Sequence, residues 1–146
     1  MNIERLGLLL HKTDSAFKRD LDTELAKLKL THHELGVLMD LYQQKVIGSD
    51  QSRTVSIIAS RLGYEAKALE KIIVKMEKND WVVRMHDQID RRRVDVFLSS
   101  KARSVIDFLK EIYGYVDDRA YKGFSKEEID QVEAYLKRID ANLNHE

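Results

Sequence analysis

The apolar residues at the start of the chain recur at helical spacing. They are separated by steps of three, four or seven positions: Leu6, Leu10, Phe17, Leu21, Leu25 and Leu28. This spacing predicts one long helix over residues 3–28. Leu8 and Leu9 widen its apolar face beyond the stripe that one packing partner needs. The helix is therefore expected to have a second contact surface, and another chain could supply it.

Three further helices are predicted over residues 31–79. Thr31 and Glu34 have capping-box spacing and open a helix that runs to about residue 44. After a polar loop over 46–53, Thr54 is the expected N-cap of a short helix over 55–62, and Gly63 is its expected left-handed C-cap. The next helix, residues 65–79, begins within a few positions. Two helices joined by so tight a turn have the helix-turn-helix layout.

The helix over 65–79 is followed by two runs of strand-forming residues, 81–86 and 94–98. In the second run Val94, Val96 and Leu98 alternate with Asp95 and Phe97, which is the period of a half-buried strand. The sequence therefore predicts a β-hairpin with a basic tip.

Two helices are predicted after the hairpin. Ser99 or Ser100 caps the first, and Ser125 with Glu128 forms a capping box that opens the last one after a break at Gly123. The expected fold is mostly α (α+β), with five or six helices and one small hairpin.

Composition excludes several classes of protein. The 146 residues are 43% hydrophobic and 34% charged, which is typical of a globular chain. With no cysteine, disulfides, thiolate metal sites and thiol redox sensing are excluded. No apolar run reaches about 18 residues and no signal-peptide pattern is present, so a soluble, cytoplasmic protein is expected. There is no glycine-rich phosphate loop and no nucleophile–base pair, so we expect neither an enzyme nor a cofactor.

The net charge of zero conceals an uneven distribution. Residues 51–103 hold 12 Lys and Arg against 7 Asp and Glu. The rest of the chain holds 13 Lys and Arg against 18 Asp and Glu, which brings the net charge to zero. In the helix over 65–79, Lys67, Lys71 and Lys75 follow one another at i,i+4 spacing, each like-charge pair costing roughly 0.2–0.5 kcal/mol in isolation. A polyanion would relieve that repulsion. Glu65 and Glu70 leave a solvated face of mixed charge as an equal alternative, although a carboxylate can also face a cytosine amino group.

The tip of the hairpin carries Arg91, Arg92 and Arg93. Arginine on such a tip fits the narrow, electronegative minor groove of DNA, and Asp90 beside it can orient one guanidinium in a bidentate pair. The alternative is a solvated turn. Because a helix-turn-helix pattern lies directly before the hairpin, the sequence favours DNA.

The hairpin and its surroundings resemble the MarR family of winged helix-turn-helix regulators over essentially the whole chain. The motif that carries this resemblance is Asp87-x-x-Asp90-Arg91-Arg92-x-Val94-x-Val96-x-Leu98-Ser99-x-Lys101, after Leu62-Gly63 and Lys78-Asn-Asp-Trp81-Val. The loop Asp50-Gln51-Ser52 and the entry Gly63-Tyr-Glu65 are most similar to the SlyA-like branch. This chain departs from the family at Asp80 and Ala102, where glycine is usual. It also has Ala66, Ala68 and Glu70 along the helix where many members have Ser, Thr or Arg.

The resemblance implies a homodimer that binds a pseudo-palindromic operator in double-stranded DNA. Residues 31–103 would form the DNA-binding domain, and residues 1–30 and 104–146 would form the dimerisation helices. Arg92 would be the minor-groove arginine and Asp90 its orienting partner. The full set of expected DNA contacts is Thr54, Arg61, Glu65, Lys67, Glu70, Lys71, Lys75, Arg84, Asp90, Arg91, Arg92 and Arg93.

Family members are often released from DNA by a small aromatic acid or phenol. The resemblance places such a ligand in a cleft near His11, Ser15, His32 and Met39. No metal site is expected, since the neighbouring His32 and His33 have no carboxylate or thiolate partner at ligand spacing and are better explained as exposed residues near a helix cap.

The expected function is that of a dimeric transcriptional regulator, a repressor or anti-silencer, acting on the nucleoid of a bacterial or archaeal cell. The alternative is a winged-helix interaction module that has lost DNA binding and acts through a protein partner. Glu65, Glu70 and the zero net charge motivate that alternative.

Overall fold

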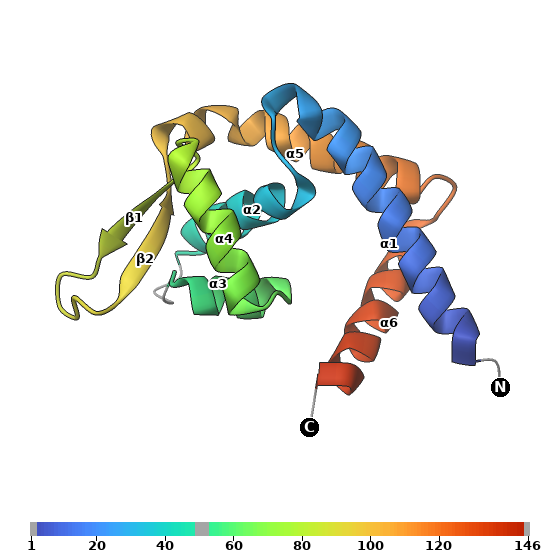
Figure 1. Cartoon of the computed structure of the whole chain (residues 1–146). Helices are drawn as coiled ribbons and strands as arrows, with labels where there is room; N and C mark the ends of the chain where they lie inside the picture. Colours follow the sequence, from blue (N-terminus) through green and yellow to red (C-terminus); the bar gives the residue numbers. More distant parts are fainter. Residues whose placement is uncertain (1–2, 49–52, 145–146) are drawn as a thin grey trace.

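Six α-helices, one short 3-10 helix and one β-hairpin make up residues 3–48 and 53–144, which the computed structural model describes (Figure 1). Their order confirms the predicted, mostly helical fold. The elements are α1 (Ile3–Leu25), η1 (Ala26–Leu28), α2 (His32–Val46), α3 (Val55–Leu62), α4 (Ala66–Lys78), β1 (Val82–His86), β2 (Val94–Leu98), α5 (Ser100–Ala120) and α6 (Lys126–Asn144). The loop Asp50-Gln51-Ser52, on which part of the SlyA-like resemblance depends, lies outside the described residues.

Both predicted capping boxes are present. The Thr31 hydroxyl accepts a hydrogen bond from the Glu34 backbone N–H at 3.2 Å, and the Glu34 carboxylate accepts one from the Thr31 N–H at 3.1 Å. Ser125 and Glu128 exchange the same pair of bonds before α6. Each box satisfies two N–H groups that have no partner within the helix, so α2 and α6 begin where the sequence predicts.

The turn between α3 and α4 has the predicted helix-turn-helix geometry. Thr54 caps α3 through a bond from the Ile57 N–H, and Gly63 ends it at φ 74°. This left-handed backbone favours glycine, because a Cβ would crowd the following carbonyl. The turn closes when the Tyr64 N–H donates to the Ala59 carbonyl at 2.9 Å, and α4 starts two residues later.

Strands β1 and β2 pair antiparallel, with Val82 opposite Leu98 and His86 opposite Val94. The alternation in β2 would place Asp95 on the solvent face, but Asp95 is only 6% exposed. Its carboxylate accepts a hydrogen bond from the Arg53 backbone N–H at 3.1 Å and pairs with Arg93 Nη2 at 3.0 Å. These partners compensate the burial of its charge.

Asp80 and Lys101 hold the base of the hairpin. Asp80 adopts φ 63°, the left-handed conformation that explains why glycine is usual at this position in the family; aspartate tolerates it better than most residues. Lys101 Nζ donates to the Asn79 carbonyl at 3.0 Å and lies 4.0 Å from the centre of the Trp81 ring. The buried indole and this lysine fix the end of α4 to the start of α5.

A single apolar core joins the C-terminal part of α1 with α2, α3, α4, the hairpin and α5. Its fully buried side chains include Leu35, Leu38, Leu41, Ile58, Leu69, Ile73, Met76, Val96 and Leu109. This core positions α4 and the hairpin relative to each other.

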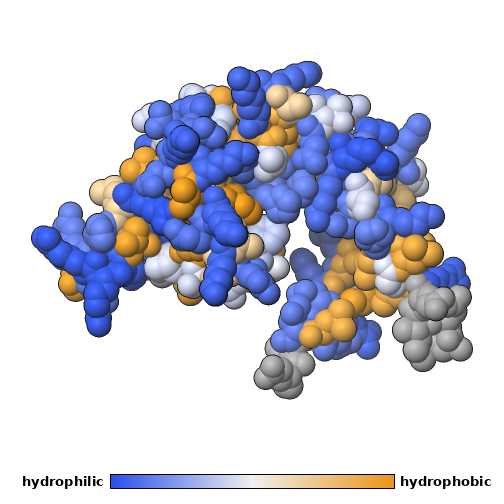
Figure 2. Space-filling model, in the orientation of Figure 1, coloured by the Kyte–Doolittle hydropathy of each residue, from blue (hydrophilic) through white to orange (hydrophobic). Residues whose placement is uncertain are grey.

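The N-terminal part of α1 and the whole of α6 extend away from this core as an arm (Figure 1). Apolar surface lies along this arm in Figure 2. In α1 the side chains of Leu8 and Leu9 are 57% and 53% exposed, and no residue of α6 is buried. These apolar faces have no partner in the described part of one chain. None of the described helices is long and apolar enough to cross a membrane.

Candidate nucleic-acid interface

The outer face of α4 presents the three lysines that the sequence singled out. Lys67, Lys71 and Lys75 are exposed, while Leu69, Ile73 and Met76 on the opposite side are buried. Among the described residues, none of the three lysines forms an ion pair. Their mutual repulsion is therefore not relieved within this part of the chain, which is what a surface for a polyanion requires.

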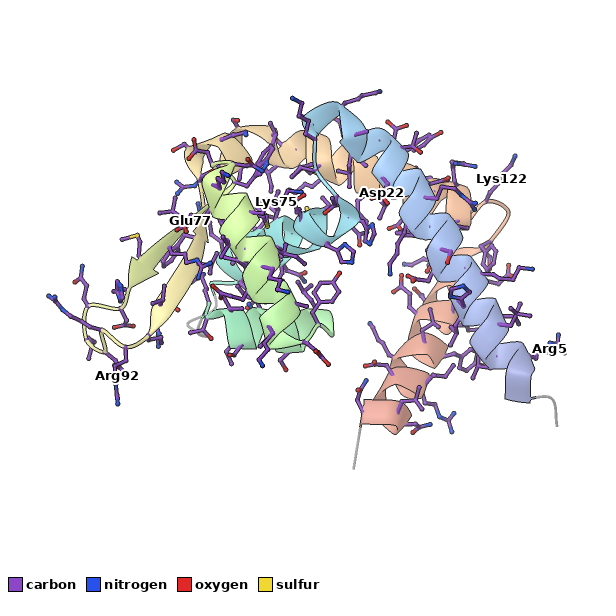
Figure 3. The ribbon with its side chains drawn as sticks, viewed as in Figure 1. Arg5, Asp22, Lys75, Glu77, Arg92 and Lys122 are labelled. Carbon is purple, nitrogen blue, oxygen red and sulfur yellow. The ribbon has the colours of Figure 1, made fainter. Side chains whose placement is uncertain are left out.

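Glu70, on the same helix, differs from the three lysines because its charge is paired within the chain. Its carboxylate accepts a hydrogen bond from Arg84 Nη1 on β1 at 2.7 Å. Arg84 Nε also lies 3.8 Å from Glu77. Glu70 and Arg84, both expected DNA contacts, are thus paired with each other, and together they join α4 to the hairpin. Figure 3 shows Lys75 and Glu77 near the C-terminal end of α4.

The loop between the strands is built around two aspartates. Asp87 Oδ1 accepts the backbone N–H groups of Ile89 at 2.7 Å and Asp90 at 3.1 Å, and these bonds hold the pKa of Asp87 below its ordinary value. Asp90 in turn accepts the Arg92 backbone N–H at 3.1 Å. The loop therefore has a defined conformation before any ligand binds.

Arg92 has the position expected of a groove-reading side chain. It is 92% exposed and lies at the tip of the hairpin, directed away from the core (Figure 3). Its Nε donates to Asp90 Oδ1 at 3.1 Å and its Nη2 to Asp90 Oδ2 at 3.5 Å. The bidentate pair expected from the sequence is present, and it sets the direction of the guanidinium.

The other two arginines of the loop differ from Arg92. Arg93 turns back toward the strands, where its Nη2 lies 2.8 Å from Asp87 and 3.0 Å from Asp95, and these carboxylates raise its pKa. Arg91 is exposed, and its carbonyl accepts a hydrogen bond from His86 Nδ1 at 2.8 Å. Arg93 therefore shapes the loop, and Arg91 and Arg92 present their charges to the outside.

Arg61, like Arg93, forms an ion pair with a carboxylate of the same chain. Its Nε and Nη2 donate to the two carboxylate oxygens of Asp40 at 2.9 and 2.8 Å, so it ties α3 to α2. Thr54 caps α3, and Glu65 is exposed at the start of α4. The structure thus gives Arg61 a positioning role beside the exposed lysines.

The four residues of the expected effector cleft lie on two helices, α1 and α2. His11 and Ser15 are exposed on α1, while His32 and Met39 are half-buried on α2. His32 Nδ1 lies 3.0 Å from Asp22 Oδ1, and the His32 and His33 rings lie at an angle of 38° with centres 3.9 Å apart. A hollow of about 520 Å³ beside α1 is lined by Phe17 and Val116 among others, and by none of the four.

No group of three or more potential metal ligands occurs among the described residues. Sequence reasoning missed Asp22 as the partner of His32 and Asp40 as the partner of Arg61, because neither pair is close enough along the chain to form a recognisable motif.

The model of the family described as transcriptional regulator SarA/Rot matches residues 21–109. The chain is 32% identical over 88 residues to the uncharacterized HTH-type transcriptional regulator YkoM of Bacillus subtilis, covering 60% of this chain and 57% of YkoM. It is 25% identical over 134 residues to the HTH-type transcriptional regulator PecS of Dickeya dadantii, covering 92% of this chain and 79% of PecS. The match to YkoM thus spans less than two thirds of that relative.

Solved structures of regulators share the fold over almost the whole chain. A mutant MarR from E. coli in complex with operator DNA superposes with a TM-score of 0.80 at 21% identity, covering 92% of this chain and 93% of MarR. CouR from Rhodococcus jostii RHA1, bound to p-coumaroyl-CoA, gives 0.79 at 19% identity, covering 92% and 90%. At these identities the likeness establishes the fold.

Proposed function

Because this chain belongs to the SarA/Rot family of MarR-type winged-helix transcriptional regulators, we propose that it binds operator DNA as a homodimer and represses transcription. It would act in the cytoplasm, on the nucleoid. The resemblance to the SlyA-like branch stays a prediction.

The observation that carries the proposal is the set of exposed cations on two separate elements. Lys67, Lys71 and Lys75 project from α4, and Arg92 projects from the hairpin loop, held in direction by Asp90. A helix of this size fits the major groove, and an arginine on a loop fits the adjacent minor groove. The DNA complex of the similarly folded MarR mutant supports the same use of this fold. Thr54 and Glu65 would lie at the edge of the contact.

The proposed dimer uses residues 1–30 and 104–146, leaving residues 31–103 as the DNA-binding domain. The apolar face of α6, which includes Leu136 and Leu143, and the exposed leucines of α1 need a partner, since such a surface is costly in water. A two-fold axis between two such arms would place the two α4 helices for successive major grooves, about 34–36 Å apart. A pseudo-palindromic operator follows from that symmetry.

We propose that a small aromatic acid or phenol releases the protein from DNA. The binding of p-coumaroyl-CoA by CouR supports an aromatic ligand for this fold. We place this ligand near His11, Ser15, His32 and Met39, on α1 and α2, in a cleft to which the second protomer contributes a wall. Such a ligand acts by favouring a dimer whose α4 helices no longer match the groove spacing.

The proposal is tested by fluorescence polarisation with labelled DNA from the region upstream of the gene, competed by unlabelled DNA of scrambled sequence. We expect specific binding, reduced at least about tenfold in Lys71→Gln with Lys75→Gln, since each lost phosphate contact weakens binding. Lys122→Gln with Lys126→Gln, which removes the same charge from the arm, is the matched control. Equal affinity for both DNAs, or equal loss in both variants, would favour the protein-interaction module instead. Sedimentation of the free protein tests the dimer.

A further inference from the structure

The most exposed large apolar side chain among the described residues lies at the tip of the wing, which consists of β1, β2 and the loop between them. This side chain is Ile89, which is 98% exposed; the next is Leu143 on the arm, at 77%. A single exposed apolar residue needs no explanation on an ordinary protein surface. The hairpin, however, projects from the domain (Figure 1), so its tip can enter a groove that the rest of the domain only approaches.

Hydrogen bonds hold the loop that carries Ile89 in one conformation. The Asp87 backbone N–H donates to the Arg93 carbonyl at 2.9 Å, and the Arg93 N–H donates to the Asp90 carbonyl at 3.0 Å, so the loop is closed at its base. The Ile89 N–H itself donates to Asp87 Oδ1 at 2.7 Å. Because the backbone is fixed before any ligand binds, little conformational entropy is lost when the tip of the wing is bound.

The charges next to Ile89 fit a polyanion better than an apolar protein surface. Arg91 and Arg92 are exposed on the same loop, and the carboxylates of the loop pair with arginines of the loop itself. Guanidinium groups beside an apolar side chain are complementary to a groove with phosphates along its edges and stacked bases at its floor. A hydrophobic protein partner would have to desolvate both arginines, which is costly. DNA is therefore the ligand that this tip favours.

Apolar side chains on elements that enter the minor groove can insert between neighbouring base pairs. They partly unstack these base pairs and kink the duplex by about 20–90° toward the major groove. We propose that Ile89 is such a wedge, so that the protein bends its operator as well as binding it. Arg92 holds the wing in the minor groove, and Ile89 opens one base step beside it. This inference rests on the proposed function, because it needs a wing in the minor groove.

The wedge gives the wing a sequence preference that needs no hydrogen bond to a base. Unstacking is easiest at the flexible pyrimidine–purine steps TA and CA/TG. A dimer with two wings therefore selects an operator that has one such step beneath each wing, and the two steps are related by the two-fold axis.

The test compares Ile89→Asn with Ile89→Leu in the full-length protein. Leucine keeps the apolar character of the side chain, whereas asparagine has a branched side chain of similar size with a polar end. The DNA is the fragment of the protein's own upstream region that the wild type protects from nuclease cleavage. Circular-permutation gel shifts measure the bend of this fragment, and permanganate, which oxidises unstacked thymines, marks the opened step.

We expect the wild type and Ile89→Leu to bend the fragment by at least about 20° and to make a thymine beneath each wing reactive. With all of the DNA bound, Ile89→Asn should lose at least about half of this bend and the thymine reactivity. Its affinity should fall less than that of Arg92→Ala, because its phosphate contacts remain. Since the Ile89 side chain is exposed, both substitutions should leave the melting temperature unchanged.

Three results would overturn this inference alone: no bend or no reactive thymine in the wild-type complex, wild-type bend and reactivity in Ile89→Asn, or equal losses in Ile89→Leu and Ile89→Asn. In each of them the protein still binds its DNA. A wild type that protects none of its upstream DNA would instead contradict the proposed function, and the wedge with it. The two kinds of failure are therefore distinguishable.

Discussion

Glu70 on α4 and Arg84 on β1 are joined by a hydrogen bond of 2.7 Å between Oε1 and Nη1, which ties the helix with the exposed lysines to the strand that leads to the wing. Both elements would meet the same DNA molecule in adjacent grooves. The pair therefore fixes the angle between them and keeps the Glu70 charge balanced, so that the surface of α4 toward DNA is cationic.

The Glu70–Arg84 pair should behave as a unit in DNA binding. Arg84→Gln frees the Glu70 and Glu77 carboxylates beside the lysines, and we expect the affinity for operator DNA to fall about threefold to tenfold. Stability should change by less than about 1 kcal/mol, because the Glu70 carboxylate is half exposed. In the double variant with Glu70→Gln the affinity should largely recover. Strictly additive losses would instead mean that Glu70 contacts DNA itself.

Asp90 should matter only through Arg92. Asp90→Asn keeps an oxygen for the Arg92 backbone N–H but removes the charge that directs the guanidinium, so operator affinity should fall about threefold to tenfold. In an Arg92→Ala background the same substitution should have almost no effect, as measured by fluorescence polarisation. An equal loss in both backgrounds would assign Asp90 a different role.

Gly63→Ala should destabilise the fold by about 1 kcal/mol, because a backbone φ of 74° is strained for any residue with a Cβ. A steric clash is not the cause, since no atom lies within 4 Å of the added Cβ. Gly36, in the interior of α2, has the same open surroundings and an ordinary helical backbone. Gly36→Ala should therefore stabilise the protein by up to about 1 kcal/mol. Urea unfolding of both variants checks the sign, and destabilisation by both would contradict this explanation.

Stability should decrease as the pH falls below about 6.5. Burial, followed by the charges of His32 and Lys18, lowers the pKa of His33 below its ordinary value of 6.5. The unfolded chain therefore binds this proton more readily, so the contribution is fully present above pH 6.5 and is lost toward the lower folded pKa. Melting temperatures of the wild type at pH 8 and pH 5.5 should differ more than those of His33→Gln. His11→Gln, at an exposed site, is the control; an unchanged difference in His33→Gln would contradict the prediction.

Local features of this fold were predictable because they depend on neighbouring residues. The Thr31–Glu34 box, the left-handed Gly63 and the hairpin with Arg92 at its tip each lie within a few positions of sequence. The pairs that were missed depend on how elements pack. Asp95 is buried because Arg53, 42 positions earlier, bonds to it, and Arg61 pairs with Asp40 across two helices. Periodicity assigns a residue to a face but does not name its partner.

The central claim, that α4 and the wing contact DNA, is tested most directly by measuring operator affinity against salt concentration for the wild type and Arg92→Ala. Phosphate contacts release counterions, so the logarithm of wild-type affinity should fall steeply and linearly with the logarithm of salt concentration. Arg92→Ala should bind much more weakly, remain folded and show a slope smaller by about one. A shallow slope with equal affinity in both proteins would contradict the account.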